Sequence, residues 1–249
     1  MSRVKASTPL RARNAAEQYD DLAGSWWQPR GPFAMLHWLA AERSKLIPAP
    51  RGSGAVLVDI ACGGGSLAPH VPPGYRHVGV DLSRTAVRVA REHGVSVIQG
   101  DATALPLANG CADVVVAGEV LEHVLDLPRA VAEACRVLAP GGTLVVDTIA
   151  ATALARVVAV TVGERVPGGP PRRLHDPQLF VDRAQLVRTC AEHGVDLRLH
   201  GLRPSVLAYL TWLLGLRDAG RIVRTRSTAV LFAAVGSKRP REVAAGARA

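Results

Sequence analysis

A glycine-rich turn directly after a short apolar segment is the feature that most constrains the fold of this chain. Residues 55–60 (AVLVDI) are apolar and mostly β-branched, as is typical of a strand buried on both faces, and Gly63, Gly64 and Gly65 follow almost at once. Glycines at the end of a parallel strand let the backbone approach a ligand closely. The turn therefore predicts a ligand-binding edge of an open α/β sheet.

The alternation of strand-like and helix-like patterns continues to residue 148. Further strand patterns cover 77–83, 95–101, 112–119 and 142–148, and helix patterns cover 67–71, 84–93 and 127–138. Strands that alternate with helices in this way are joined by right-handed crossovers into a parallel sheet. We therefore predict the α/β class, with a doubly wound, mostly parallel seven-stranded sheet and helices on both faces.

The alternation of strand and helix patterns stops after residue 148 and resumes at residue 183. From there we expect a helix (183–193), a strand (195–200), an amphipathic helix (204–219) and a last strand (227–237). This pattern predicts five parts. They are a helical N-terminal cap over 1–47, a ligand-binding α/β core over 48–148, an insertion or lid over 149–182, the C-terminal part of the same α/β domain over 183–237, and a flexible tail over 238–249.

The composition is that of one globular domain. The chain has 249 residues, 48% of them hydrophobic and 20% charged, which excludes a disordered chain or a disulfide scaffold. The formal net charge is +9, but the arginines form no stripe with interleaved aromatic residues, so no nucleic-acid partner is expected. The four cysteines form no CxxC pair, no apolar run is long enough to span a bilayer, and no secretory signal begins the sequence. We expect a reducing, cytoplasmic setting.

Aspartates stand at the ends of the second and third predicted strands. Asp81 lies 16 residues after Gly65, where a carboxylate can accept both hydroxyls of an adenosine ribose. Asp101 is placed to accept a hydrogen bond from the exocyclic amine of an adenine. The turn itself, with Ala61, Gly63 and Gly65, lacks the GxGxxG spacing of dinucleotide-binding enzymes. The pattern therefore favours a site for a single nucleoside.

An acidic segment with a histidine, Gly118-Glu119-Val120-Leu121-Glu122-His123, follows the fourth predicted strand. Two carboxylates and an imidazole can converge on a turn that leaves the sheet edge. Such a group can serve as a general base for a phenolic proton or as ligands of a divalent cation. In the alternative reading, Glu122 and His123 cap the following helix and face solvent.

The glycine spacing, the two aspartates and the turn Leu138-Ala139-Pro140-Gly141-Gly142 together resemble the Rossmann-like class I S-adenosylmethionine-dependent methyltransferases over residues 55–148. The resemblance implies S-adenosylmethionine as the cofactor. It implies that Asp59 lies near the methionine amino group, that Gly63 and Gly65 flank the methionine and ribose, that Asp81 holds the ribose and that Asp101 meets the adenine edge. Ala61 replaces a glycine of the pattern and adds one methyl group. The other implied cofactor-binding residues are Leu82, Ala102 and Gly118.

A narrower resemblance extends over nearly the whole chain. The segments WWQPRGPF with LH (26–37), DIACGGGSLA (59–68), EVLEHV (119–124) and the residues Val166-Pro167, Leu174-His175-Asp176 and Phe180-Val181 resemble, in the same order, blocks of the ubiquinone-biosynthesis O-methyltransferases. This implies O-methylation of one hydroxyl of an ortho-dihydroxy aromatic ring, with Arg43 reaching the cofactor carboxylate. It also implies catalytic roles for Glu119, Glu122 and His123, with a divalent cation such as Mg²⁺ near these three.

Other parts of this reading stay open. His175 is expected either as a second base or ligand, or as a surface histidine of a loop. The segment DTIAAT (147–152) lacks an amide and a cation of the family, so the acceptor is either a ubiquinone precursor or a related phenolic, quinol or polyketide-derived ring.

The apolar face over 149–173, with Arg156 and Arg165 beside it, is expected either to contact a membrane peripherally, admitting a prenylated acceptor, or to pack as a lid. The three tryptophans Trp26, Trp27 and Trp38 either roof the pocket or belong to the core. Alternative functions are a C- or N-methyltransferase of a secondary-metabolite pathway and a non-catalytic cofactor-binding scaffold.

Overall fold

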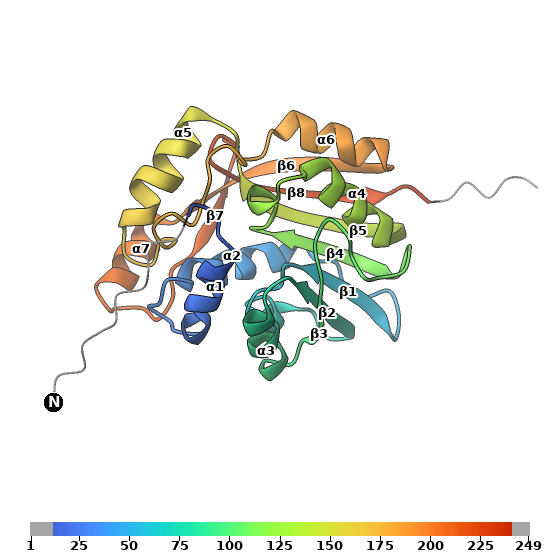
Figure 1. Ribbon diagram of the computed structural model, residues 1–249, viewed down its shortest axis with the longest axis horizontal. Coiled ribbons are helices and arrows are strands. Elements are labelled where there is room, and N and C mark those ends of the chain that lie inside the picture. Colours follow the sequence, from blue (N-terminus) through green and yellow to red (C-terminus); the bar gives the residue numbers. More distant parts are fainter. Residues whose placement is uncertain (1–11, 241–249) are drawn as a thin grey trace, which may run out of the picture.

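The computed structural model describes residues 12–240, so the first eleven residues and most of the expected tail lie outside the described part of the chain. Its centre is one sheet of eight strands in the order β3-β2-β1-β4-β5-β8-β6-β7 (Figure 1). The strands are β1 (Ala55–Ile60), β2 (Tyr75–Asp81), β3 (Ser96–Gln99), β4 (Ala112–Gly118), β5 (Leu138–Ile149), β6 (Val195–Pro204), β7 (Ile222–Thr225) and β8 (Leu231–Lys238).

The helices vary in type and length. The α-helices are α1 (Glu17–Asp21), α2 (Ala34–Arg43), α3 (Arg84–Glu92), α4 (Leu127–Val137), α5 (Ala153–Ala155), α6 (Arg183–Glu192) and α7 (Val206–Leu213). A π-helical stretch, η5 (Arg156–Val162), continues α5 directly. The short 3-10 turns are η1 (Ala23–Ser25), η2 (Ser44–Leu46), η3 (Ala68–His70), η4 (Leu121–His123) and η6 (Gly163–Arg165).

The helices that follow strands begin where the sequence places a capping side chain. Ser83, Asp126, Asp182 and Ser205 precede α3, α4, α6 and α7, and each side chain accepts a hydrogen bond from a backbone N–H in the first helical turn. These bonds satisfy donors that a helix start otherwise leaves unpaired.

The predicted fold class is confirmed, and the predicted number of strands is wrong by one. Strands β1 to β5 pair in parallel, and β8 pairs antiparallel with both β5 and β6. The additional strand is β7, which pairs antiparallel with β6. It has only four residues (IVRT). Four residues are too few to show the alternation of apolar and polar side chains that identifies a strand in a sequence.

Two predicted helices differ from the structure. The predicted helix at 67–71 is the 3-10 turn η3, because Pro72 and Pro73 follow and cannot continue a helix. The predicted helix at 204–219 is shorter, since α7 ends at Leu213. No helix within residues 12–240 combines the length and apolarity needed to cross a bilayer.

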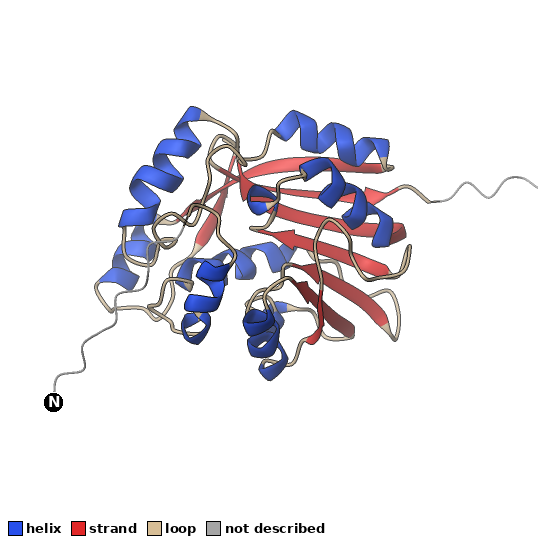
Figure 2. Ribbon diagram, in the orientation of Figure 1, coloured by secondary structure: helices blue, strands red, loops and turns tan. Residues whose placement is uncertain are grey.

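Helices cover both faces of the sheet (Figure 2). Val58 and Val115 share a core with residues of α4 and α6 on one face. Leu57 and Val116, whose side chains alternate with the first pair, pack with Ala40 of α2 on the other face. Both faces of the central strands are therefore buried, and their carboxyl ends are the edge left for a site.

The C-terminal strands offer a test of the observed pairing. A Cβ atom added to Gly201 in β6 would lie 1.7 Å from the backbone oxygen of Ser227. Ser227 lies in the short connection between β7 and β8, so its backbone cannot move away easily. We expect Gly201→Ala to lower the free energy of unfolding by about 1–3 kcal/mol, as overpacking does. Gly52→Ala is the matched control, because a Cβ there meets no atom within 4 Å. Urea denaturation followed by circular dichroism measures both, and equal midpoints would contradict the β6–β7–β8 arrangement.

Candidate active site

One cavity of about 930 Å³ opens at the carboxyl ends of the parallel strands. Its walls come from the ends of β1, β2 and β4, from α1 and α2, and from the insertion, which is residues 149–182. Figure 1 shows α1 and α5 beside this end of the sheet. Most of the predicted cofactor-binding residues line the cavity, namely Arg43, Asp59, Ala61, Gly63, Asp81, Leu82, Asp101, Ala102 and Gly118.

Gly65 is the predicted cofactor residue that is absent from the lining. A Cβ atom on Gly65 would lie 3.2 Å from the Cα of Ala90 in α3, and its φ of +83° is in the left-handed region. This glycine therefore brings the turn close to α3. The glycines before it contact Trp26, since a Cβ on Gly63 or Gly64 would lie 2.5 Å from that ring.

Asp81 joins the glycine turn to the end of β2. Its Oδ2 accepts a hydrogen bond from Gly63 N at 2.8 Å, and its Oδ1 accepts one from Ser83 N at 2.8 Å. Burial raises the pKa of Asp81, while these two backbone donors act in the opposite direction. The second predicted aspartate, Asp101, is exposed and accepts from Thr103 N at 2.7 Å. Both carboxylates are thus held in place by backbone donors.

Three non-glycine residues at the cavity have left-handed backbone conformations that usually belong to glycine. Ala61, after β1, has a φ of +54°, Glu119, after β4, has a φ of +51°, and Asn14 has a φ of +56°. Such a conformation costs a non-glycine residue about 1–2 kcal/mol. Strain of this kind concentrates at functional sites. Ala61 is the position where the sequence departs from the glycine pattern, so the departure carries a backbone cost.

A buried ion pair lies beneath the cavity. Arg43 Nε donates to Asp147 Oδ2 at 2.8 Å, and Arg43 Nη2 lies 2.8 Å from Asp147 Oδ1. The backbone N–H of Glu119 also donates to Asp147 Oδ1, at 3.1 Å. Gly118 leaves room for the guanidinium, because a Cβ there would lie 1.9 Å from Arg43 Cζ. The sequence alone indicated no role for Asp147 as the partner of Arg43.

The acidic segment after β4 folds inward. Glu122 is completely buried, and its Oε2 accepts a hydrogen bond from Thr148 Oγ1 at 2.7 Å. The alternative in which Glu122 faces solvent is therefore wrong. The turn η4 brings His123 to the cavity wall, and the insertion brings His175 beside it, with the ring centroids 5.2 Å apart. His175 is buried, so it is no surface histidine.

Burial sets the charge of these groups. It raises the pKa of Glu122 to about 7 and holds the pKa of Glu119 well above its usual value, with the Glu122 charge adding to the latter shift. Burial lowers the pKa of His123 to about 3 and that of His175 to about 4. Both imidazoles are therefore neutral at pH 7, and a neutral ring can accept a proton or bind a metal ion.

The buried cluster contains polar atoms without hydrogen-bond partners. Within residues 12–240, these include Glu119 Oε1, Glu122 Oε1 and His175 Nδ1. One ligand atom from each of Glu122, His123 and His175 lies within 4.8 Å of the others, whereas Glu119 is outside this group. Buried polar atoms are nearly always paired, so these atoms are available to a bound ion, a water molecule or a substrate. A carboxylate with two imidazoles is a donor set that fits a divalent cation.

Sequence reasoning missed two residues that contact His123. Tyr19 OH lies 3.2 Å from His123 Nε2, and Asn14 Oδ1 lies 2.6 Å from His123 Nδ1. Both residues precede the tryptophan segment and form their bonds across more than 100 positions of sequence. No spacing or period marks such a contact, so no signal in a single sequence could have found them.

The three tryptophans divide between pocket and core. Trp26 lines the cavity. Trp27 stacks on His93 with the ring centroids 3.8 Å apart, and its Nε1 donates a hydrogen bond to Gly64 O. Trp38 packs edge-on against Trp212 in a separate apolar cluster. Only Trp26 of the three therefore roofs the site.

The fold agrees with comparisons to known proteins. Residues 58–146 match the family described as "Methyltransferase domain". A solved S-adenosylmethionine-dependent methyltransferase from Thermotoga maritima, described as a possible histamine N-methyltransferase, has the same fold. Its TM-score is 0.63 at 20% identity, covering 90% of this chain and 97% of that one. The chain is an S-adenosylmethionine-dependent methyltransferase, as the first resemblance predicted.

Closer relatives define the family. The chain is 37% identical over 203 residues to the ubiquinone biosynthesis O-methyltransferase of Cupriavidus pinatubonensis, covering 78% of this chain and 81% of the relative. It is 33% identical to the enzyme of the same name from Methylobacterium sp. (strain 4-46), covering 90% and 93%. The chain belongs to the family of the ubiquinone biosynthesis O-methyltransferases, which confirms the second resemblance.

The fit between Gly118 and Arg43 gives a prediction. We expect Gly118→Ala to lower the free energy of unfolding by about 3–5 kcal/mol, because the methyl group displaces the guanidinium and leaves Asp147 as an unpaired buried charge. Thermal unfolding measures the effect. Gly24→Ala is the control, since a Cβ there has no neighbour within 4 Å. Equal melting temperatures of the two variants would show that the pair tolerates the methyl group.

Proposed function

We propose that this methyltransferase transfers the methyl group of S-adenosylmethionine to one hydroxyl of a catechol-like or quinol-like aromatic ring. The observation that carries the proposal is the buried group of Glu122, His123 and His175, which adjoins the cavity that also contains Asp81 and Asp101. Groups that can take up a phenolic proton thus lie beside the expected nucleoside site. The names of the relatives support an O-methyl acceptor of this kind.

In this proposal the cofactor lies along the ends of β1 and β2. Asp81 and Asp101, with Leu82 and Ala102 between and beside them, would hold the adenosine. Asp59, Ala61 and Gly63 would border the methionine part of the cofactor. Gly65 would not contact the cofactor, but it lets the glycine turn pack closely against α3. Arg43 would meet the cofactor carboxylate with the N–H groups that Asp147 leaves available. The support is that all but Gly65 line one cavity.

The protein's own share of the reaction is to position the acceptor and receive its proton. Burial makes His123 and His175 weak bases, with pKa values of about 3 and 4. Either ring therefore accepts a phenolic proton only beside ionised Glu119 and Glu122, whose negative charge stabilises the imidazolium. Methyl transfer requires an in-line approach of oxygen to the methyl carbon, so positioning supplies much of the rate. We therefore assign the catalytic roles to Glu119, Glu122, His123 and His175.

We further propose that Glu122, His123 and His175 hold a divalent cation. The sequence favoured Mg²⁺, but two imidazoles with one carboxylate fit Zn²⁺ or Fe²⁺ better, because Mg²⁺ prefers oxygen ligands. The sequence favoured Glu119, Glu122 and His123, but the unpartnered atoms and their spacing support His175 as a ligand, with Glu119 beside the group. A bound cation would lower the pKa of a coordinated phenol. The high pKa values of the buried carboxyl groups are consistent with a site that favours added positive charge.

The insertion supports an acceptor with an apolar tail. Val158, Ala159 and Val162 of η5 line the cavity, while Leu154 and Val157 are each 53% exposed. One segment therefore presents aliphatic side chains both to the site and to the outside. We propose that residues 149–173 contact the membrane surface peripherally and admit a prenylated acceptor, with the exposed Arg156 and Arg165 near anionic headgroups.

The acceptor class is tested with methyl-labelled cofactor and a panel of ortho-diphenols, hydroquinones, monophenols and primary amines, followed by mass spectrometry. We expect methyl ethers from the diols only, loss of turnover with EDTA and recovery when Zn²⁺, Fe²⁺ and Mg²⁺ are added back separately, with less recovery by Mg²⁺ than by the other two. His123→Asn should lower kcat by about 10²–10⁴-fold, as loss of a general base does. Binding of S-adenosylmethionine, measured by calorimetry, should stay unchanged.

His193→Asn is the matched control, because His193 lies at the end of α6 and does not line the cavity. Methylated amines, or carbon-methylated rings, would contradict the proposed acceptor. Full turnover in EDTA would contradict the cation.

Membrane contact is tested by co-sedimentation with vesicles. We expect the chain to bind anionic vesicles and the double variant Leu154→Ser/Val157→Ser to bind about tenfold more weakly, because each aliphatic side chain contributes on the order of 1 kcal/mol when partly inserted. Vesicles of neutral phosphatidylcholine are the control. Equal binding of both proteins to anionic vesicles would instead favour a lid that packs on its own domain.

A further inference from the structure

The side chain of Asn14 contacts His123 at two points. Asn14 Nδ2 donates a hydrogen bond to the backbone oxygen of His123 at 2.9 Å. Asn14 Oδ1 lies 2.6 Å from Nδ1 of the same histidine ring. One amide thus spans the backbone and the ring of a single residue in the proposed active site.

These two contacts determine where the ring hydrogen lies. A backbone oxygen can only accept, so the Asn14 atom facing it must be the NH₂ group, and the Asn14 oxygen must face the ring. An amide oxygen can also only accept, so His123 Nδ1 must be the nitrogen that carries the hydrogen. In a neutral imidazole the other nitrogen, Nε2, then has the lone pair.

A second contact agrees with this arrangement. Tyr19 OH lies 3.2 Å from His123 Nε2 and can donate its hydrogen to a lone pair there. Tyr19 and His123 both line the cavity. Asn14 lines it as well. The two partners therefore give the ring one donor side, Nδ1 toward Asn14, and one acceptor side, Nε2 toward the Tyr19 hydroxyl.

We propose that Asn14 is a positioning residue that fixes the tautomer of His123, keeping the hydrogen on Nδ1 and the lone pair on Nε2. The inference rests on the proposed function, because it assigns the lone pair a use as base or cation ligand. Partners of this kind orient metal-binding and catalytic histidines in many proteins.

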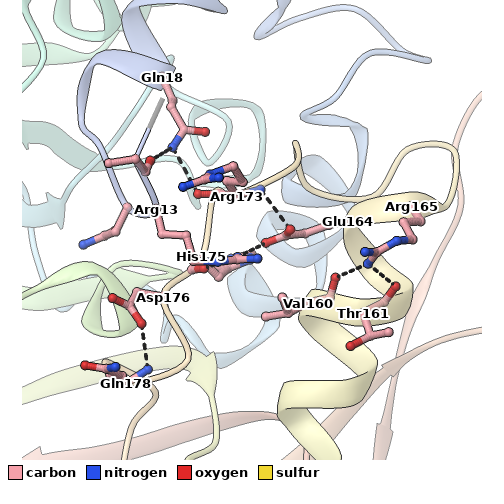
Figure 3. A network of polar contacts seen from close by, with 12 residues as sticks. Arg13, Gln18, Val160, Thr161, Glu164, Arg165, Arg173, His175, Asp176 and Gln178 are labelled. Atoms are coloured by element: carbon pink, nitrogen blue, oxygen red, sulfur yellow. Dashed lines mark hydrogen bonds and ion pairs between the residues drawn. The ribbon is translucent and has the colours of Figure 1, made fainter. Parts of the chain in front are cut away.

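Arg13, the residue before Asn14, belongs to a network between the N-terminal segment and the insertion (Figure 3). Arg13 Nη1 donates to Glu164 Oε1 at 3.1 Å and to the backbone oxygen of His175 at 2.8 Å. Arg173 N donates to Glu164 Oε2 at 2.8 Å, and Asn14 N donates to Arg173 O at 3.2 Å. The segment that carries Asn14 is therefore tied to the loop that carries His175.

The backbone of Asn14 suits this residue. Its φ of +56° is left-handed, a conformation that asparagine, aspartate and glycine adopt at lower cost than other residues. Asn14→Gly can therefore remove the side chain without new backbone strain. Asn14→Asp keeps an acceptor for Nδ1–H, replaces the donor to the His123 backbone oxygen with an acceptor and adds a negative charge.

The tautomer is measured directly by long-range ¹H–¹⁵N correlation spectra of the full chain labelled at its histidine rings. The spectrum of a His123→Gln variant identifies the His123 signals among the eight histidines. We expect His123 to carry its hydrogen on Nδ1 in the unsubstituted protein and in Asn14→Asp. In Asn14→Gly, signals of the Nε2–H form should appear.

The same variants are assayed for methyl transfer. We expect Asn14→Gly to lower kcat by about 10–100-fold, the usual effect of removing such a partner. Asn14→Asp should recover most of this loss, and cofactor affinity should stay unchanged in both. Asn109→Gly, in an exposed turn remote in sequence from both contacts, is the matched control for the substitution and should leave the His123 signals unchanged.

Two results would overturn the inference. One is a His123 ring with its hydrogen on Nε2 in the unsubstituted protein. This measurement does not depend on whether any variant folds. The other is an Asn14→Gly protein with an unchanged tautomer. An Nδ1–H ring in a protein that methylates no diol would support the role of Asn14 while contradicting the proposed acceptor, so the two failures can be told apart.

Discussion

The buried ion pair between Arg43 and Asp147 is the interaction on which the rest of the site depends. It joins α2 to the carboxyl end of β5, and the same carboxylate accepts the backbone N–H of Glu119. That bond helps to hold Glu119 in its left-handed conformation at the end of β4. Breaking a buried pair leaves an uncompensated charge, which costs more than the pair contributes when intact. The geometry of the acidic segment thus depends on a residue about 80 positions earlier in the chain.

Carboxyl groups are concentrated at this edge of the sheet. Asp59, Glu119, Glu122 and Asp147 are all buried or line the cavity, and the shifted pKa values of Glu119 and Glu122 reflect the cost of placing charge there. A ligand that brings positive charge lowers this cost. The sulfonium of the cofactor and a divalent cation both do so, and each would favour the ionised carboxylates that the proposed chemistry uses.

The sequence predicted what local patterns encode. Strands β1 to β5, the glycine turn and Asp81 and Asp101 could be placed because strand periods and strand ends are local, and parallel strands bring their carboxyl ends to one edge. The strand β7 was too short to produce a period. Long-range contacts could not be predicted from local patterns either. His175 approaches Glu122 only when the insertion folds back onto the sheet edge. Asn14 contacts His123 across 109 positions of sequence.

The apolar wall at the start of the insertion constrains the acceptor. Ala150 and Ala151 belong to the segment 147–152, where the resemblance implies an amide and a cation that this sequence lacks. Ala150 is fully buried beside β8, with its backbone N–H bonded to Val230 O. The adjoining cavity wall includes Ile149, Val230 and Leu231, which are apolar. At this part of the wall an acceptor meets aliphatic surface, so an anionic substituent there would lose hydration without gaining a counter-charge from positions 150 and 151. The acceptor groups that approach the start of the insertion should therefore be uncharged, as in a ring whose substituents are methyl, methoxy or prenyl groups.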